Sequence, residues 1–208
     1  TISLEDYIAS GKGHIASSSK NKIAIIYAQG EIIYGEGSED VIGQDLINEA
    51  IRKAVKDNHV KAIVLRVNSP GGSALASELI WRELELAKKE KPLVVSMGNL
   101  AASGGYYIAC NAHKIIAEPT TITGSIGVFG AIPNAYEFTQ NIGINAEHVR
   151  TNTSAYYSIF EPMNETFYEV TKEGVEHIYN TFVTRVATGR NMSFEAVNAI
   201  AQGRVWTG

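Results

Sequence analysis

The chain has 208 residues, of which 45% are hydrophobic and 19% charged, which is enough for one α/β domain with a real core. Its net charge of −4 and the lack of a basic run argue against a nucleic-acid partner. No segment reaches the roughly 18 apolar residues of a membrane-spanning helix. The single cysteine, Cys110, excludes an internal disulfide and indicates a buried side chain. The spacing of His, Cys, Asp and Glu predicts no metal site, and we expect no cofactor.

The two ends of the chain indicate that it is a fragment of a longer protein. Residues 1–20 combine a short helical stretch with a serine-rich segment, which is typical of a linker or N-terminal extension. Residues 21–208 form the predicted domain. The chain starts without a Met or a signal peptide and stops at Gly208 without a terminating pattern. We therefore expect this domain to be truncated at its C-terminus.

The hydrophobic pattern alternates between strands and helices. Strands are predicted at 22–27, 62–67, 93–97, 114–117 and 144–150, with 30–35 extending or pairing with the first of them. Helices are predicted at 45–57, 75–86, 104–110, 133–141, 164–188 and 193–202. This alternation is typical of right-handed βαβ units and a mostly parallel sheet, in which ligands bind at the carboxyl ends of the strands.

The most informative segment is the pentapeptide Ala-Ser-Gly-Gly-Tyr at 102–106, which follows the apolar run 92–97. Its place between a strand and a helix predicts a tight turn that contains Ser103. A serine in such a turn exposes its hydroxyl beside the unpaired N–H groups of a helix N-terminus. This is the geometry of a nucleophile elbow.

A second glycine-rich turn, Asn-Ser-Pro-Gly-Gly-Ser at 68–73, directly follows the apolar strand 63–67. Two strand ends can build one site, with the nucleophile in one turn and the backbone amides of an oxyanion hole in the other. Gly-Gly pairs also occur simply as turns. A phosphate site is less favoured, because neither turn has the spacing of the phosphate-binding glycine motifs.

The sequence offers no recognisable base for Ser103. A Ser-His-Asp triad stays open, but no histidine has an activating context. A lysine made neutral by burial is the other choice, yet the lysines fall in solvent-facing patterns such as 88–91. The histidines are His14, His59, His113, His148 and His177.

Three segments, 68–73, 101–107 and 123–128, together resemble the signatures of the signal peptide peptidase A (protease IV) family. Gly189-Arg190 and the closing segment 201–208 also resemble it. The resemblance implies a crotonase/Clp-protease-like fold and a serine endopeptidase with a Ser-Lys dyad that degrades residual signal peptides. It further implies a membrane anchor outside this region, a catalytic domain on the extracytoplasmic side, and a homo-oligomer, namely a tetramer around an enclosed bowl.

The resemblance also assigns roles to single residues. Ser103 becomes the nucleophile, and the N–H groups of Gly72 and Gly104 become the oxyanion donors. Ser125 resembles the serine that orients the lysine amine. The chain departs from the short family members at Tyr157, where they have the lysine. A phenol with a pKa near 10 does not replace a desolvated amine.

The missing lysine fits the C-terminal half of the long family members, whose lysine lies in the N-terminal half. We therefore expect Tyr156 and Tyr157 to be packing or interface residues, the other half of the protein to be a partner, and the isolated fragment to be inactive. Two alternatives stay open. One is a crotonase-type enzyme acting on an acyl-thioester, for which the nearby acid Glu78 is interpreted as part of a solvated helix face. The other is a non-catalytic half that only assembles rings.

Overall fold

The computed structural model describes residues 19–152 and 154–208, so the helical stretch expected within 1–20 lies outside the described residues. The main sheet has six strands in the order β1-β5-β6-β8-β9, with β7 also paired to β6. All pairs in it are parallel except β8 with β9. The strands are β1 Lys22–Gln29, β5 Val60–Ser69, β6 Leu93–Ala102, β7 Lys114–Ile116, β8 Ile122–Gly124 and β9 Val205–Thr207.

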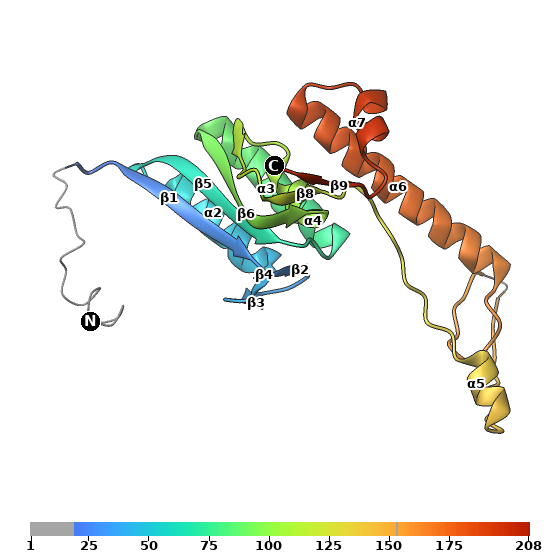
Figure 1. The fold of residues 1–208 in the computed structure, drawn as a ribbon. Helices are drawn as coiled ribbons and strands as arrows, with labels where there is room; N and C mark the ends of the chain where they lie inside the picture. The colour runs from blue at the N-terminus through green and yellow to red at the C-terminus, as the bar shows by residue number, and fades with distance from the viewer. Residues whose placement is uncertain (1–18, 153) are drawn as a thin grey trace, which may run out of the picture.

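Helices α2 (Gln44–Lys56) and α3 (Ala74–Glu90) pack beside each other against this sheet (Figure 1). The alternation of β5 drives this packing, because Ile63, Leu65 and Val67 are completely buried. The buried side chains of the helices that face them include Ile51 and Ile80. The βαβ alternation and the mostly parallel sheet expected from the sequence are therefore confirmed.

A second, three-stranded sheet has the order β2-β4-β3, with β2 Glu31–Ile33, β3 Gly37–Ser38 and β4 Val41–Gly43. The segment 30–35 thus pairs with β4 and does not extend β1. Ile32 of β2 is hydrogen-bonded to the glycine turn at 68–73, through Ile32 N–H to Gly71 O at 2.8 Å and Ser73 N–H to Ile32 O at 2.7 Å. The small sheet therefore holds that turn in place.

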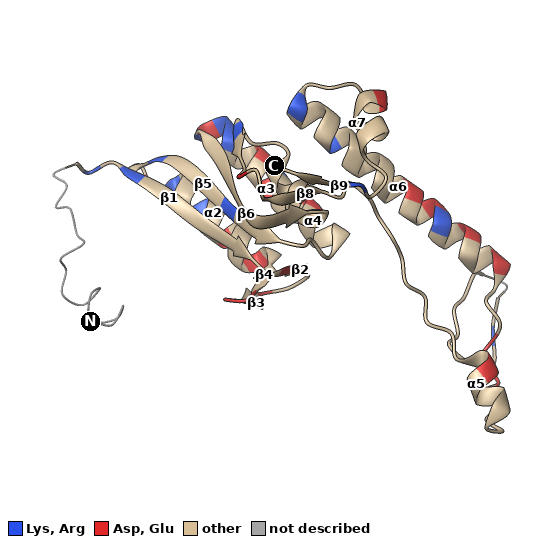
Figure 2. Ribbon diagram, viewed as in Figure 1, with Lys and Arg blue, Asp and Glu red and all other residues tan. Residues whose placement is uncertain are grey.

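After β8 the chain leaves the sheet, runs out to α5 (Tyr136–Asn141) and returns to the start of α6 (Glu165–Arg190), as Figure 1 shows. We call residues 130–164 the arm. Helix α6 has 26 residues, about 39 Å at 1.5 Å per residue. Its buried side chains all lie in its C-terminal half, namely Phe182, Val183, Val186 and Ala187. Its N-terminal half carries several charged side chains (Figure 2), as expected of a helix in contact with water.

The chain ends with α7 (Phe194–Ile200) and β9, which bring it back beside β8. Ser193 caps α7 by accepting a hydrogen bond from Ala196 N–H at 3.1 Å, as the sequence predicts. Gly124, which pairs with Val205 of β9, also pairs with Ala102 at the start of the Ser103 turn. The closing residues therefore belong to the same edge of the sheet as the two glycine turns.

The strand predicted at 144–150 is wrong. These residues are irregular and exposed, and Val149 is completely exposed. A strand needs a neighbour for its backbone groups, and the arm offers none to this segment among the described residues. The short strands β8 and β9 were not predicted, because three residues carry no clear alternation.

No helix in the described part of the chain is both long and apolar enough to cross a membrane.

Candidate active site

Ser103 lies at the junction between β6 and the short helix α4 (Gly104–Ala109), as the sequence predicts. Its backbone has φ 51° and ψ −122°, a conformation that costs a non-glycine residue on the order of 1–3 kcal/mol. Two backbone hydrogen bonds hold it there: Ser103 N–H donates to Gly124 O at 3.0 Å, and Tyr107 N–H donates to Ser103 O at 2.9 Å. The Ser103 hydroxyl does not cap α4 and so is left free for chemistry.

The two glycine turns touch each other through their backbones. A Cβ added at Gly71 would lie 2.6 Å from Gly104 N and 2.8 Å from Ser103 Cβ, and Gly71 has φ 101°. A Cβ at Gly104 would lie 2.6 Å from Ser77 Oγ and 3.2 Å from Gly72 N. Both positions therefore require glycine, for reasons of space at both and of backbone conformation at Gly71.

The amides of Gly72 and Gly104 are available as hydrogen-bond donors. Within the described residues, neither N–H donates to a backbone or side-chain acceptor. Gly104 N belongs to the first turn of α4, where helical N–H groups have no partner in the helix. Because a Cβ added at Gly104 would lie 3.2 Å from Gly72 N, the two donors lie close together beside Ser103, as an oxyanion hole requires.

Ser125 follows β8 as Ser103 follows β6. The strand residues before them, Gly124 and Ala102, are paired in register. Ser125 also has a positive φ of 49°, and its N–H donates to Arg204 O at 2.7 Å. The closing segment of the chain thus fixes the position of Ser125.

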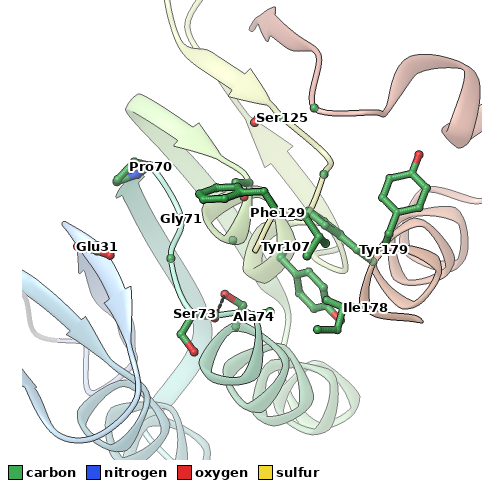
Figure 3. Close-up of a pocket in the computed structure, with 18 of the residues that line it drawn as sticks. Glu31, Pro70, Gly71, Ser73, Ala74, Tyr107, Ser125, Phe129, Ile178 and Tyr179 are labelled. Atoms are coloured by element: carbon green, nitrogen blue, oxygen red, sulfur yellow. Dashed lines mark hydrogen bonds between the residues drawn. The ribbon is translucent and has the colours of Figure 1, made fainter. Parts of the chain in front are cut away.

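A cavity of about 960 Å³ is lined by Gly72, Ser103, Gly104 and Ser125. Figure 3 shows Pro70 and Gly71 on the side opposite Tyr179. Aromatic and aliphatic side chains supply much of the wall, and Glu31 is the one charged residue among the described lining. The apolar lining includes Tyr107, Val128, Phe129, Ile178, Tyr179 and Phe182.

No lysine or histidine occurs among the described residues that line this cavity. His113 Nδ1 accepts a hydrogen bond from Leu93 N–H at 3.0 Å, at the opposite end of β6, which is about 30 Å long. His148 pairs with Glu161 in the arm at 2.5 Å, and His59 pairs with Asp57 at 3.2 Å. The described histidines therefore do not supply a base to Ser103, and His14 lies outside the described residues.

The arm contains both tyrosines that stand near the position of the family lysine. The Tyr157 hydroxyl donates to Pro133 O, and its ring stacks on Phe167 with centroids 5.3 Å apart. The Tyr156 hydroxyl donates to Glu161 Oε2 at 2.9 Å. Neither side chain lines the cavity, and both pack within the arm and the start of α6.

Glu78 lies on a partly solvated helix face, with 32% of its side chain exposed, but it is also paired across helices, which the sequence did not indicate. Its carboxylate accepts hydrogen bonds from the Tyr107 hydroxyl at 2.5 Å and from Arg185 Nη2 at 2.6 Å. It is absent from the cavity lining. Sequence reasoning also missed Tyr107, Tyr179, Phe182 and Gln202 as cavity residues. Only Tyr107 carried a local signal, because it stands one helical turn after Ser103.

The fold and the serine elbow define a Clp-protease-like α/β domain. A mutant of ClpP1 from Listeria monocytogenes has a similar structure, with a TM-score of 0.53 and 14% identity, over 88% of this chain and 80% of that one. The match supports the expected fold class and nothing finer.

The chain belongs to peptidase family S49, whose family model matches residues 85–208. It is 44% identical to Protease 4 of Haemophilus influenzae over its whole length, which is 34% of that protein. It is 38% identical to the chloroplastic serine protease SPPA of Arabidopsis thaliana over 92% of this chain and 29% of that one. A putative signal peptide peptidase SppA of Enterococcus faecium is 33% identical, with 92% and 57% covered. The chain thus spans about a third of the long relatives.

Proposed function

We propose that this chain is the serine-bearing half of a peptidase that degrades signal peptides after their release. Ser103 Oγ attacks the peptide carbonyl carbon, and the carbonyl oxygen becomes an oxyanion that accepts hydrogen bonds from Gly72 N–H and Gly104 N–H. A lysine amine from another part of the longer protein takes the Ser103 proton and passes it to the leaving amine. Water then hydrolyses the acyl-enzyme, with the same amine as base.

The observation that carries this proposal is the meeting of Ser103 with two unpaired glycine amides in one cavity. The lack of a lysine or histidine in the described lining supports a base from outside the chain. So does the length of the relatives, of which this chain covers about a third. We assign Ser125 the role of hydrogen-bonding the incoming amine, since it lies beside Ser103 at the end of the neighbouring strand.

The substrate we propose is an apolar peptide. The cavity wall of Tyr107, Phe129, Ile178 and Phe182 favours apolar side chains. The name of the Enterococcus faecium relative, a putative signal peptide peptidase, supports signal peptides as the substrate. We extend the proposal to a membrane anchor outside these residues and a catalytic domain on the extracytoplasmic side, which rest on the family resemblance alone.

We also propose a homo-oligomer, expected to be a tetramer. The described part of the arm exposes several large apolar side chains that no other described residue covers, and such surfaces favour association. They include Phe138 at 64%, Ile142 at 54%, Ile144 at 50% and Val149 at 100% exposed. The N-terminal half of the same protein is the second proposed partner, because it would supply the lysine.

Labelling with a fluorophosphonate probe tests the catalytic proposal. The full-length protein should be labelled at Ser103, and the Ser103→Ala variant should not. The isolated 208-residue chain should react about 10²–10⁴ times more slowly than the full-length protein, which is the usual contribution of a general base.

Two results would contradict the proposal. Equal labelling of the full-length protein and its Ser103→Ala variant would show that Ser103 is not the nucleophile. Equal rates for the isolated chain and the full-length protein would place the base within these 208 residues.

A further inference from the structure

Glu78 connects three helices that lie far apart in the sequence. From α3 its carboxylate accepts a hydrogen bond from the Tyr107 hydroxyl of α4 at 2.5 Å. It also accepts from Arg185 of α6, through Nη2 at 2.6 Å and Nε at 3.4 Å. The Arg185 guanidinium lies 4.0 Å above the Trp81 ring of α3. The carboxylate is therefore bound from two sides by groups whose own positions are fixed.

All three of these helices line the cavity, α3 through Ala74 and Ser77. Tyr107 comes from α4, one turn after Ser103, and its ring packs on Phe182 of α6 with centroids 4.5 Å apart. Phe182 lies one turn before Arg185 on the same helix. Any shift of Arg185 relative to Glu78 would therefore move the apolar wall relative to the nucleophile.

Among the described residues, helix α6 makes no side-chain hydrogen bond or ion pair with α3 or α4 other than those of Arg185. Its N-terminal half extends away from the sheet with the arm (Figure 1), and its buried residues are apolar. Apolar packing alone allows a helix to slide and settle in more than one position, whereas a bidentate ion pair fixes a register. Burial and the neighbouring Glu78 carboxylate raise the pKa of Tyr107, so its hydroxyl remains a donor at neutral pH.

We propose that Glu78 is a positioning residue that sets the distance between the α6 wall and Ser103, and so determines the size of the side chain that the cavity accepts. The inference rests on the proposed function of Ser103. Glu78 acts through Tyr107 and Arg185 and does not touch the substrate.

A series of peptide boronic acids tests this inference in the full-length protein. The compounds differ only in the side chain next to boron, which is that of Ala, Leu or Phe. Their boron forms a reversible bond to a serine oxygen. We expect the Glu78→Gln variant to reduce the preference for the Leu compound over the Ala compound by about tenfold, a usual range for a pocket that loses its fit.

The matched control is Glu83→Gln, on the same helix. Glu83 forms an ion pair with Arg52 at 2.6 Å and does not line the cavity. Both variants remove one carboxylate of an Arg–Glu pair from α3, so a merely structural loss would affect them alike. Only Glu78→Gln should change the size preference. If it fails to fold, Tyr107→Phe, which keeps the ring on Phe182, should reduce the preference in the same direction.

The outcomes separate the two proposals. If binding requires Ser103 but both glutamine variants keep the native size preference, the role of Glu78 is overturned and the proposed function stands. If Ser103→Ala binds the boronic acids as well as the native protein does, or nothing binds, both proposals fall.

Discussion

Ser103 and Ser125 are the first residues after two neighbouring strands whose last residues, Ala102 and Gly124, are paired in register. Both serines have a positive φ, 51° and 49°, and Ser103 N–H donates to Gly124 O at 3.0 Å. Two strand ends at one level of the sheet therefore present two hydroxyl-bearing residues to the same cavity. In the proposed mechanism one attacks the peptide and the other holds the amine that activates it.

Removing the Ser125 hydroxyl should lower kcat of the full-length protein by about 10²-fold and leave KM nearly unchanged, because the hydroxyl orients the base and does not bind substrate. The melting temperature should not change, since within the described chain this hydroxyl makes no hydrogen bond. Steady-state kinetics and thermal unfolding of Ser125→Ala measure both effects, with exposed Ser38→Ala as the control. A native kcat in Ser125→Ala would remove the residue from the mechanism.

A methyl group at Gly104 should disrupt the contact between the two glycine turns. The added Cβ would lie 2.6 Å from Ser77 Oγ, so Gly104→Ala should lower the free energy of unfolding by about 1–3 kcal/mol and abolish probe labelling of Ser103. Adding Ser77→Ala removes the obstructing oxygen and should restore part of the stability. Chemical denaturation of the single and double variants checks this; simple additivity of the two changes would contradict the proposed clash.

Two glycines of α6 should respond in opposite ways to the same substitution. A Cβ at Gly189 would overlap the Cys110 carbonyl oxygen and lie 3.0 Å from Asn111 Cα, whereas Gly174 has nothing within 4 Å. We expect Gly189→Ala to destabilise the protein by about 1–3 kcal/mol. Gly174→Ala should stabilise the helix by up to about 1 kcal/mol through helix propensity. Denaturant midpoints of the two variants decide the matter, and stabilisation by both would show that α6 does not approach α4 closely.

Cys110 should be unreactive in the folded protein. It is completely buried, and burial raises the pKa of its thiol from about 9 to about 12. Since the folded state holds this proton more tightly, the contribution to stability is fully present below about pH 9 and is lost as the pH rises toward 12. An aromatic disulfide reagent should therefore modify Cys110 only in denaturant. Rapid modification of the native protein at neutral pH would show that α4 is not packed as described.

The parts of this protein that depend on residues adjacent in the chain can be predicted from the sequence alone. The elbow at Ser103 is predictable, because an apolar strand, a Ser-Gly-Gly turn and a short helix follow one another within 93–110. The glycine turn at 68–73 and the βαβ alternation are predictable for the same reason. Turn chemistry and hydrophobic periodicity are local properties of the chain.

The contacts between segments that are distant in the sequence become visible only in the folded chain. The register of Ala102 with Gly124 places Ser125 beside Ser103, and without the family resemblance Ser125 is an ordinary turn residue. Glu78 and Arg185 are 107 residues apart in the sequence, so no local sequence pattern predicts their ion pair. The segment 144–150 has strand-like residues but no neighbouring strand. Pairing, burial and long-range ion pairs depend on what packs against a residue, and the arrangement of the whole chain decides that.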